Sequence, residues 1–338
     1  MTVLIGIDPH KGSHTAVAVD GDEVAVGEVK VRSSGRQCGE LLAWAEAFPS
    51  RRWAIESASG LGYLLAQQLV AAGESVVDVP PTLSARVRVL GSGKSYKNDP
   101  NDALSTAVAA LRGRRLREVS VDDHRGILRL LADRHHDLTA LRTQAACRLH
   151  AQLAALVPGG IPGRLSASSA ARLINSVPES NGVIAERRRQ ASALTADVAR
   201  LDDDLAELKA RIRLAVAASN TTLTAINGVG PFVAALVLGH AGDIGRFATR
   251  HHFASYNATA PLEASSGPKK RHRLNPRGNR QLNHAMHIVA ITQIRHDTPG
   301  RVYYLRKIEE GKTKKEALRA LKRRISDAIY RQLVIDAQ

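Results

Sequence analysis

The first 110 or so residues alternate between short apolar runs and segments with helical spacing. Short runs and period-two alternation predict strands, which we place at Val3–Asp8, Thr15–Val19, Glu23–Val31, Arg52–Ile55 and Ser75–Val79. Apolar residues three and four positions apart predict helices, which we place at Cys38–Ala47, Leu61–Ala72 and Asn98–Leu111. A hairpin followed by alternating strands and helices indicates an α/β domain built on a mixed sheet.

From about residue 121 the pattern changes to long amphipathic helices. Helical spacing runs over 121–156 and, after a loop rich in Gly, Pro and Ser, over 181–216. These segments predict two helices packed as an antiparallel pair or coiled coil. The pair could form an ordinary helical core or serve as an oligomerisation arm, and the pattern favours neither role. The last part is predicted to be mostly helical and to end in a helix containing Lys314–Gln332. We therefore predict three domains, with the bounds 1–115, 116–217 and 218–338.

The net charge of +16 and the isoelectric point near 10.3 indicate a polyanionic partner. Residues 1–110 hold 10 Lys/Arg and 12 Asp/Glu, whereas residues 216–338 hold 20 and 8. This asymmetry suggests an acidic catalytic domain followed by nucleic-acid-binding domains. A hydrophobic fraction of 44% excludes a disordered chain, and two cysteines do not support a disulfide scaffold. Without a bilayer-length apolar stretch or a signal peptide, we expect a cytoplasmic protein with no membrane partner.

Four acids of the first domain have positions that suggest a metal site. Asp8 and Glu56 each end a predicted strand. Asp99 and Asp102 lie three residues apart, on one face of a predicted helix. Converging carboxylates repel one another unless cations lie between them, and a pair of Mg²⁺ ions ~4 Å apart would suit oxygen ligands and act on a phosphodiester. Taken singly, each acid could be a cap or a solvated residue, and Asp99 before Pro100 fits a helix N-cap.

The sequence Ile-Asn-Gly-Val-Gly-Pro at 226–231 has the form of a helix-hairpin-helix turn. Gly228 and Gly230 would let the backbone approach a phosphate, which free N–H groups at the start of the next helix would bind without reading bases. The alternative is a Gly-rich connector between two helices.

A serine box, Ser265–Ser266–Gly267, precedes a basic run without acids. The basic residues of this run are Lys269, Lys270, Arg271, Arg273, Arg277 and Arg280. They would hold a phosphate beside the serine and stabilise the charge that develops on it. From spacing alone, an ordinary loop beside a solvated basic run is the better interpretation. The histidines have no metal-ligand spacing with cysteines and are interpreted mainly as surface or core residues.

Together these motifs resemble those of the DEDD transposases of the insertion-sequence one-ten family, the RNA-guided serine recombinases. In the first domain the resemblance rests on GIDPHKG at 6–12, IESASG at 55–60 and KNDPNDA at 97–103. In the last domain it rests on GVGP at 228–231, SSG at 265–267, RGNR at 277–280, GKTKKEA at 311–317 and AIYRQL at 328–333. The RGNR box is usually followed by an arginine where this chain has Asn283 or His284, and these two residues are given no role.

The resemblance implies a RuvC-like, RNase H-type first domain, a helical coiled-coil arm and a C-terminal transposase domain with a serine nucleophile. The metal-binding set that it implies, for Mg²⁺, is Asp8, Glu56, Asp99 and Asp102. It also implies that Ser266 attacks DNA and forms a covalent phosphoserine link, while the serine doublet leaves Ser265 as an alternative. The implied partners are donor and target DNA, a structured noncoding bridge RNA that pairs with both, and further copies of the chain in tetramers assembled from dimers.

The function expected from the sequence is therefore RNA-guided, site-specific DNA recombination through a covalent phosphoserine intermediate. The alternative is a metal-dependent, structure-specific DNA nuclease that resembles a Holliday-junction resolvase. A covalent protein–DNA adduct separates these two functions, because hydrolysis leaves none. A third class, a non-enzymatic nucleic-acid-binding relative, is disfavoured by the presence of all four acids and the serine.

Overall fold

The structure, a computed structural model, describes residues 2–92, 98–113, 116–160, 163, 165–263, 272–273, 275 and 278–338. The chain divides into two compact units, a first unit of residues 1–122 and a second unit of residues 123–338. The division into three domains with the bounds given above stays a prediction. No helix in the described part of the chain has the length and apolar character needed to cross a membrane.

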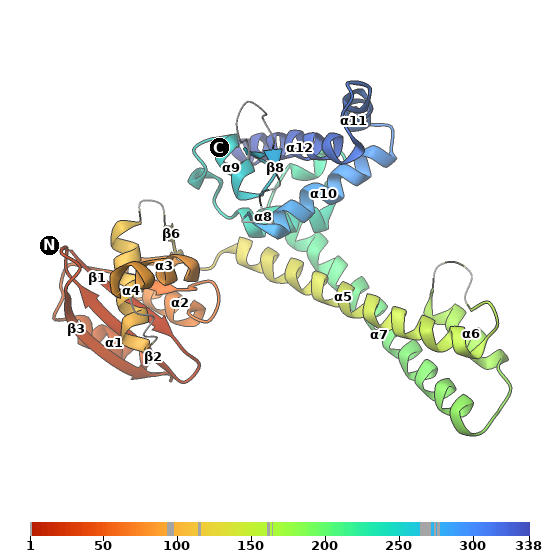
Figure 1. Cartoon of the computed structure of the whole chain (residues 1–338), viewed down its shortest axis with the longest axis horizontal. Helices are drawn as coiled ribbons and strands as arrows, with labels where there is room; N and C mark the ends of the chain where they lie inside the picture. Colours follow the sequence, from red (N-terminus) through yellow and green to blue (C-terminus); the bar gives the residue numbers. More distant parts are fainter. Residues whose placement is uncertain are drawn as a thin grey trace. The chain divides into compact units, whose positions relative to one another are not determined.

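The first unit is built on one mixed sheet in the order β3-β2-β1-β4-β5-β6 (Figure 1). Its strands are β1 (Val3–Pro9), β2 (Ser13–Val19), β3 (Ala25–Arg32), β4 (Arg51–Glu56), β5 (Val76–Val79) and β6 (Arg117–Glu118). The first three strands form an antiparallel meander, β1, β4 and β5 are parallel, and β6 runs antiparallel to β5. The predicted RNase H-like α/β fold is thereby confirmed.

Helices cover both faces of this sheet. On one face α1 (Gln37–Ala45) and α2 (Tyr63–Ala71) bury leucines against Ile5, Ile7 and Trp53. On the other face α3 (Pro81–Ser92) and α4 (Asp99–Arg112) contribute small and aliphatic residues to the core. Strand β1 is buried from Leu4 to Pro9 because helices lie on both of its sides.

Helix α4 packs unusually close to β1 at Gly6. A Cβ atom at Gly6 would lie 2.1 Å from the carbonyl oxygen of Ala103 and 2.8 Å from the Cβ of Ala107. Only a glycine on the strand and alanines on the helix allow this approach. The contact fixes the height of α4 above the sheet.

Three features of the first unit differ from the sequence prediction, and the first is strand β6, which the prediction lacks. Helix α3 is absent from the prediction, in which Pro80–Pro81 only ends a strand. In the structure Pro81 is the first residue of the helix, a position that tolerates its fixed φ. The N-cap of α4 is Asn98 rather than Asp99, since the Asn98 side chain accepts a hydrogen bond from the backbone N–H of Asn101 at 2.9 Å. Asp99 is thereby left free for another role.

The second unit begins with the long helices that the sequence predicts, α5 (His124–Leu156) and α7 (Gly182–Ala218), which lie side by side (Figure 1). A short helix, α6 (Ala167–Ser176), lies between them in the chain. Their seam buries Leu138, Leu149 and Leu153 of α5. Other apolar residues of the predicted stripe point to solvent; these are Ile127, Leu130 and Leu141.

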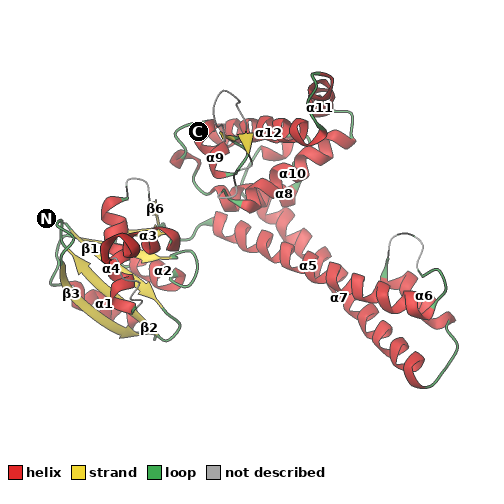
Figure 2. Ribbon diagram, in the orientation of Figure 1, coloured by secondary structure: helices red, strands yellow, loops and turns green. Residues whose placement is uncertain are grey.

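The rest of the second unit is mostly helical (Figure 2). Its helices are α8 (Pro231–Ala241), α9 (Arg250–Tyr256), α10 (Arg280–Arg295), α11 (Pro299–Glu309) and α12 (Lys314–Asp336), with 3-10 turns at Leu223–Ala225 and Ile244–Arg246. A two-stranded ribbon pairs β7 (Leu262–Glu263) with β8 (His272–Arg273). Helices α8, α10 and α12 share one core with α5 and α7.

Candidate functional site

The four acids singled out in the sequence meet at one edge of the sheet. Strands β1 and β4 are parallel neighbours, with Ile7 opposite Ile55, so Asp8 and Glu56 leave the sheet at the same edge. Helix α4 crosses above β1 and brings in the carboxylates of Asp99 and Asp102 from its first turn. The structure therefore brings together all four predicted residues.

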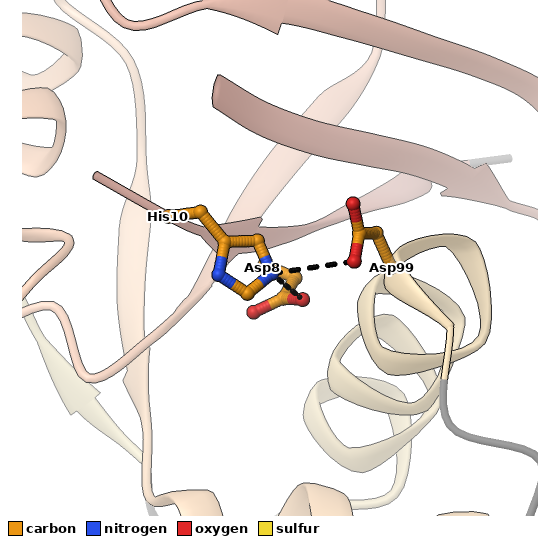
Figure 3. A group of neighbouring side chains, drawn as sticks. All are labelled: Asp8, His10 and Asp99. Carbon is orange, nitrogen blue, oxygen red and sulfur yellow. Dashed lines mark ion pairs between the residues drawn. The ribbon is translucent and has the colours of Figure 1, made fainter. Parts of the chain in front are cut away.

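Figure 3 shows the carboxylates of Asp8 and Asp99 both lying near the same nitrogen of the His10 imidazole. The Nε2 atom of His10 lies 3.0 Å from Oδ2 of Asp8 and 3.4 Å from Oδ1 of Asp99. One ligand atom from each of these three residues lies within 4.8 Å of the other two. His10 lies two residues after Asp8 in the sequence but is not among the predicted metal ligands.

The carboxylates are close enough to shift one another's pKa. Burial raises the pKa of Asp8 and the charges of Asp102 and Asp99 raise it further, while His10 lowers it. Burial also raises the pKa of Glu56, helped by the charges of Asp8 and Asp102. Hydrogen bonds from Ser84 and Thr106 oppose that rise. Crowded carboxylates with raised pKa values are typical of a site that receives a cation.

Two basic side chains of the protein partly neutralise this cluster. The Nζ atom of Lys30, on β3, donates to Oδ2 of Asp99 at 2.8 Å and lowers the pKa of that carboxyl. Arg88, on α3, forms an ion pair with the buried Asp102. Sequence reasoning missed Arg88 because it missed α3. The signal was present, since Leu83, Val87 and Leu90 follow Pro81 at helical spacing.

The acid cluster suits a hard divalent cation. Its donors are carboxylate oxygens, which Mg²⁺ and Ca²⁺ prefer. The Oδ2 atom of Asp8 is buried and, apart from the His10 imidazole, has no partner among the described residues. Burying a carboxylate oxygen without a partner costs folding free energy, and a bound cation would offset that cost. Asp8, Glu56, Asp99 and Asp102 could therefore hold a divalent metal, and among them Asp8 and Asp99 offer ligand atoms within 4.8 Å of each other.

In the second unit, the turn at residues 226–231 packs tightly against α10. Gly228 has a φ of +87°, and a Cβ on it would lie 3.1 Å from the carbonyl oxygen of Val289. Gln293 donates to the carbonyl oxygen of Asn227 at 2.7 Å. Gly230, at the N-cap of α8, has open space where a Cβ would lie. Packing thus explains Gly228, and phosphate binding at Gly228 and Gly230 stays a prediction.

Most of the serine box and basic run lies outside the described residues. This applies to Ser265, Ser266, Lys269, Lys270, Arg271 and Arg277. The backbone of Arg273 belongs to β8, where it pairs with Leu262. Arg280 is exposed as the first residue of α10.

The two ends of the segment that carries the serine box are joined by hydrogen bonds. The backbone N–H of Asn279 donates to the carbonyl oxygen of Tyr256 at 2.6 Å. The side-chain amide of Asn283 donates to the carbonyl oxygens of Asn257 and Ala258, at 3.0 and 3.2 Å. We call this set the asparagine clasp. It places the entry and exit of residues 259–278 side by side.

Two family models match the chain. A transposase model of the DEDD type found in IS110 matches residues 5–158. A model described as transposase IS116/IS110/IS902 family matches residues 220–305. All four clustered acids lie in the first matched region, and the glycine turn and serine box lie in the second.

Relatives from three insertion elements are similar to the chain. An IS116 protein of 44.8 kDa from Streptomyces clavuligerus is 26% identical over 98% of this chain and 94% of its own length. An IS900 protein of 42 kDa from Mycobacterium paratuberculosis is 25% identical over 98% and 95%. An IS110 protein of 43.6 kDa from Streptomyces coelicolor is 39% identical over 33% of this chain and 28% of its own.

Among solved structures, Thermus thermophilus RuvC in complex with a Holliday junction substrate matches 35% of this chain and 100% of that one, at 19% identity and a TM-score of 0.28. Another Thermus thermophilus RuvC structure matches 35% of this chain and 99% of that one, at 16% identity and a TM-score of 0.27. The two family models, together with relatives aligned over nearly the whole length, establish that the chain belongs to the IS110 family of DEDD transposases, the insertion-sequence one-ten family.

Proposed function

We propose that this transposase is a site-specific DNA recombinase that works through a covalent phosphoserine intermediate. The observation that carries the proposal is the convergence of Asp8, Glu56, Asp99 and Asp102 at one edge of an RNase H-like sheet, in a chain whose second matched region contains Ser266. The acids would hold Mg²⁺, which stabilises charge on a phosphodiester.

In this proposal Ser266 is the nucleophile. Its hydroxyl oxygen forms a bond to the DNA phosphorus, the bond to the departing strand's oxygen breaks, and the serine proton ends on that oxygen. The reverse step, with the hydroxyl of another strand, reseals the DNA and restores the serine. One phosphate ester replaces another at each step, so no ATP is needed.

The residues around the acids have positioning roles in this proposal. Arg88 holds Asp102 and Lys30 holds Asp99 before a metal arrives, which keeps both carboxylates aimed at the cluster. His10, between Asp8 and Asp99, is placed to bind a metal or to hold a proton at Nε2. Burial at Asp8 and Glu56 limits the competition from water for the cation.

We further propose that a structured noncoding bridge RNA pairs with donor and target DNA, and that the active form is a tetramer of two dimers. The resemblance of the motifs to those of RNA-guided recombinases suggests both, and the net charge of +16 suits binding to RNA and DNA. Purification of the chain with its flanking noncoding RNA, followed by mass measurement with and without that RNA, tests them. A complex without RNA that still selects its target would remove RNA guidance.

The phosphoserine step is tested by trapping the protein–DNA adduct on a denaturing gel. Ser266→Ala should abolish the adduct, while binding of RNA and DNA changes less than about twofold, because only the hydroxyl oxygen is removed. Ser265→Ala is the matched control and should retain the adduct. The reverse pattern would move the nucleophile by one residue. DNA cleavage by the wild-type chain without any adduct would indicate a metal-dependent nuclease.

A further inference from the structure

Four basic side chains from three helices of the second unit lie together, and we call them the basic cluster. They are His136 of α5, His284 and His287 of α10, and Lys322 of α12. The ring centroids of His136 and His284 are 6.4 Å apart. His284 and His287 are three residues apart and therefore share one face of α10. Lys322 donates from Nζ to Oδ1 of Asn283, at 2.6 Å.

The basic cluster contains no negative charge to balance it. Lys322 is only 9% exposed, and burial lowers its pKa to about 8. The pKa of His284 is lowered by burial and then by His136, His287 and Lys322. That of His287 is lowered by burial and by Lys322. Among the described residues, no carboxylate contributes to any of these shifts.

Among the described residues, the neighbouring group whose pKa responds to the basic cluster is also basic. His135 of α5 has its pKa lowered by burial, then by Lys209 of α7 and by His136. Asp137, the exposed sequence neighbour of His136, contributes to none of the shifts. Elsewhere in the same unit a buried histidine is paired with an acid: Nε2 of His240 lies 3.1 Å from Oδ1 of Asp133. Within the described residues, a group of basic side chains with no acid among them is therefore a distinct feature of the α5–α10–α12 surface.

We propose that the basic cluster is a binding site for one backbone phosphate of DNA. A phosphate would supply the missing negative charge and accept hydrogen bonds from the imidazoles and from the remaining protons of Lys322. The location supports this role, because Asn283, the partner of Lys322, also belongs to the asparagine clasp that closes the serine-bearing segment. That this phosphate belongs to DNA, rather than to another molecule, rests on the proposed recombinase function.

The proposal has a direct test that needs no DNA. The full chain is labelled with ¹⁵N-histidine, and the imidazole signals are titrated with pH in the presence and absence of inorganic phosphate. The pKa values of His284 and His287 should rise by roughly 1 unit with phosphate, since an opposite charge within a few ångströms stabilises the imidazolium. His150, exposed on α5, is the control and should not move. Lys322→Met should diminish the rise.

The DNA arm uses fluorescence anisotropy with a duplex and the full chain. Wild-type affinity should increase several-fold between about pH 7 and pH 6, because a bound phosphate raises the lowered pKa values of His284 and His287 and so favours their protonation, while Lys322, with a pKa of about 8, is already mostly charged. The double variant His284→Gln/His287→Gln should lose most of that increase, and its log–log salt slope at pH 6 should flatten by ~0.9, the value for one phosphate. The double variant His150→Gln/His296→Gln, in which two exposed histidines of the same unit are replaced, should behave as wild type.

The phosphate titration and the duplex-binding measurement together distinguish failure of the phosphate site from failure of the proposed recombinase function. A phosphate-dependent pKa rise without duplex affinity would support the phosphate site and overturn the DNA role. Duplex binding that is equal in wild type and His284→Gln/His287→Gln at both pH values, with no pKa rise in phosphate, would overturn the site and leave the recombinase proposal standing. A rise at His150 equal to that at His284 would reduce the effect to general ion binding and overturn the site.

Discussion

Glu56 and Asp99 belong to one acid cluster, yet their surroundings shift their pKa values in opposite directions. Glu56 is buried beside Asp8, which raises its pKa, whereas Asp99 accepts a hydrogen bond from Lys30, which lowers its pKa. At neutral pH both groups can serve as ligands, but only Glu56 resists ionisation when no cation is present. The cluster therefore combines carboxylates that differ in how much they need a metal.

The pH dependence of stability tests this view of Glu56. A carboxyl whose pKa is raised by folding gives stability that is present below its unfolded pKa and is lost as the pH rises through the folded value. Without metal, the Tm of Glu56→Gln should therefore rise relative to wild type as the pH is raised above about 4, and Mg²⁺ should reduce that gain. Thermal unfolding across a pH series measures it. Glu46→Gln, at an exposed position, should show no such trend.

Asp102→Asn tests the metal site itself. Replacing one charged oxygen weakens a hard-cation site. We expect strand cleavage to fall by more than roughly 100-fold, a larger loss than is typical for a residue that only hydrogen-bonds to a metal ligand. Asp22→Asn, at an exposed acid outside the cluster, is the control. Unfolding curves check that loss of the Arg88 ion pair has not unfolded the variant. Full cleavage by Asp102→Asn, or by wild type in excess chelator, would remove the metal from the mechanism.

At the scale of elements, the site depends on how closely α4 approaches β1. Asp8 lies on the strand and Asp99 and Asp102 on the helix, so the spacing between strand and helix sets the spacing between their carboxylates. Gly6 permits that spacing because its missing Cβ would overlap the backbone of Ala103. A strand residue with no side chain thus acts as a positioning residue for the cluster.

Gly6→Ala should push α4 away from the sheet. Overpacking of this kind costs about 1–3 kcal/mol of unfolding free energy, and the displaced carboxylates should lower metal affinity as well. Urea unfolding and isothermal titration with Mg²⁺ measure the two effects. Gly12→Ala is the matched control, since nothing lies within 4 Å of the Cβ that it adds. Equal stability and equal affinity in the two variants would contradict the role given to Gly6.

The sequence predicted the strands and the long helices well, because burial of one or both faces of an element produces a regular spacing of apolar residues along the chain. It failed at α3, where two prolines masked a helix start, and Arg88 was missed with it. It also overestimated the apolar stripe of α5, where Leu130 is 71% exposed, since spacing alone cannot say which side of a long helix has a partner. The four acids were found because strand ends and an i,i+3 pair are visible in the chain, whereas Lys30 and His10 acquire their contacts only in the folded unit.

For the whole molecule, the basic excess of residues 216–338 predicts binding dominated by the phosphate backbone. If Lys269, Lys270 and Arg271 each touch a phosphate, replacing all three with alanine should flatten the log–log dependence of DNA affinity on salt by ~2 to 3 units. Filter binding over a salt series gives the slope. Matched and unmatched DNA should weaken alike, because backbone contacts carry no base information. An unchanged slope would mean that the three side chains are only solvated, and a loss confined to matched DNA would mean that they read bases.

The asparagine clasp has a consequence for how this family can diversify. Because Asn279 and Asn283 join the chain to Tyr256, Asn257 and Ala258, the two flanks of the serine-bearing segment lie side by side. Doubling the length of such a closed loop costs only about 0.6 kcal/mol of closure entropy. We therefore expect a change in the length of this segment to cost the second unit little stability. Relatives could trade or lengthen it, and thereby change the DNA they engage, without altering the core that supports it.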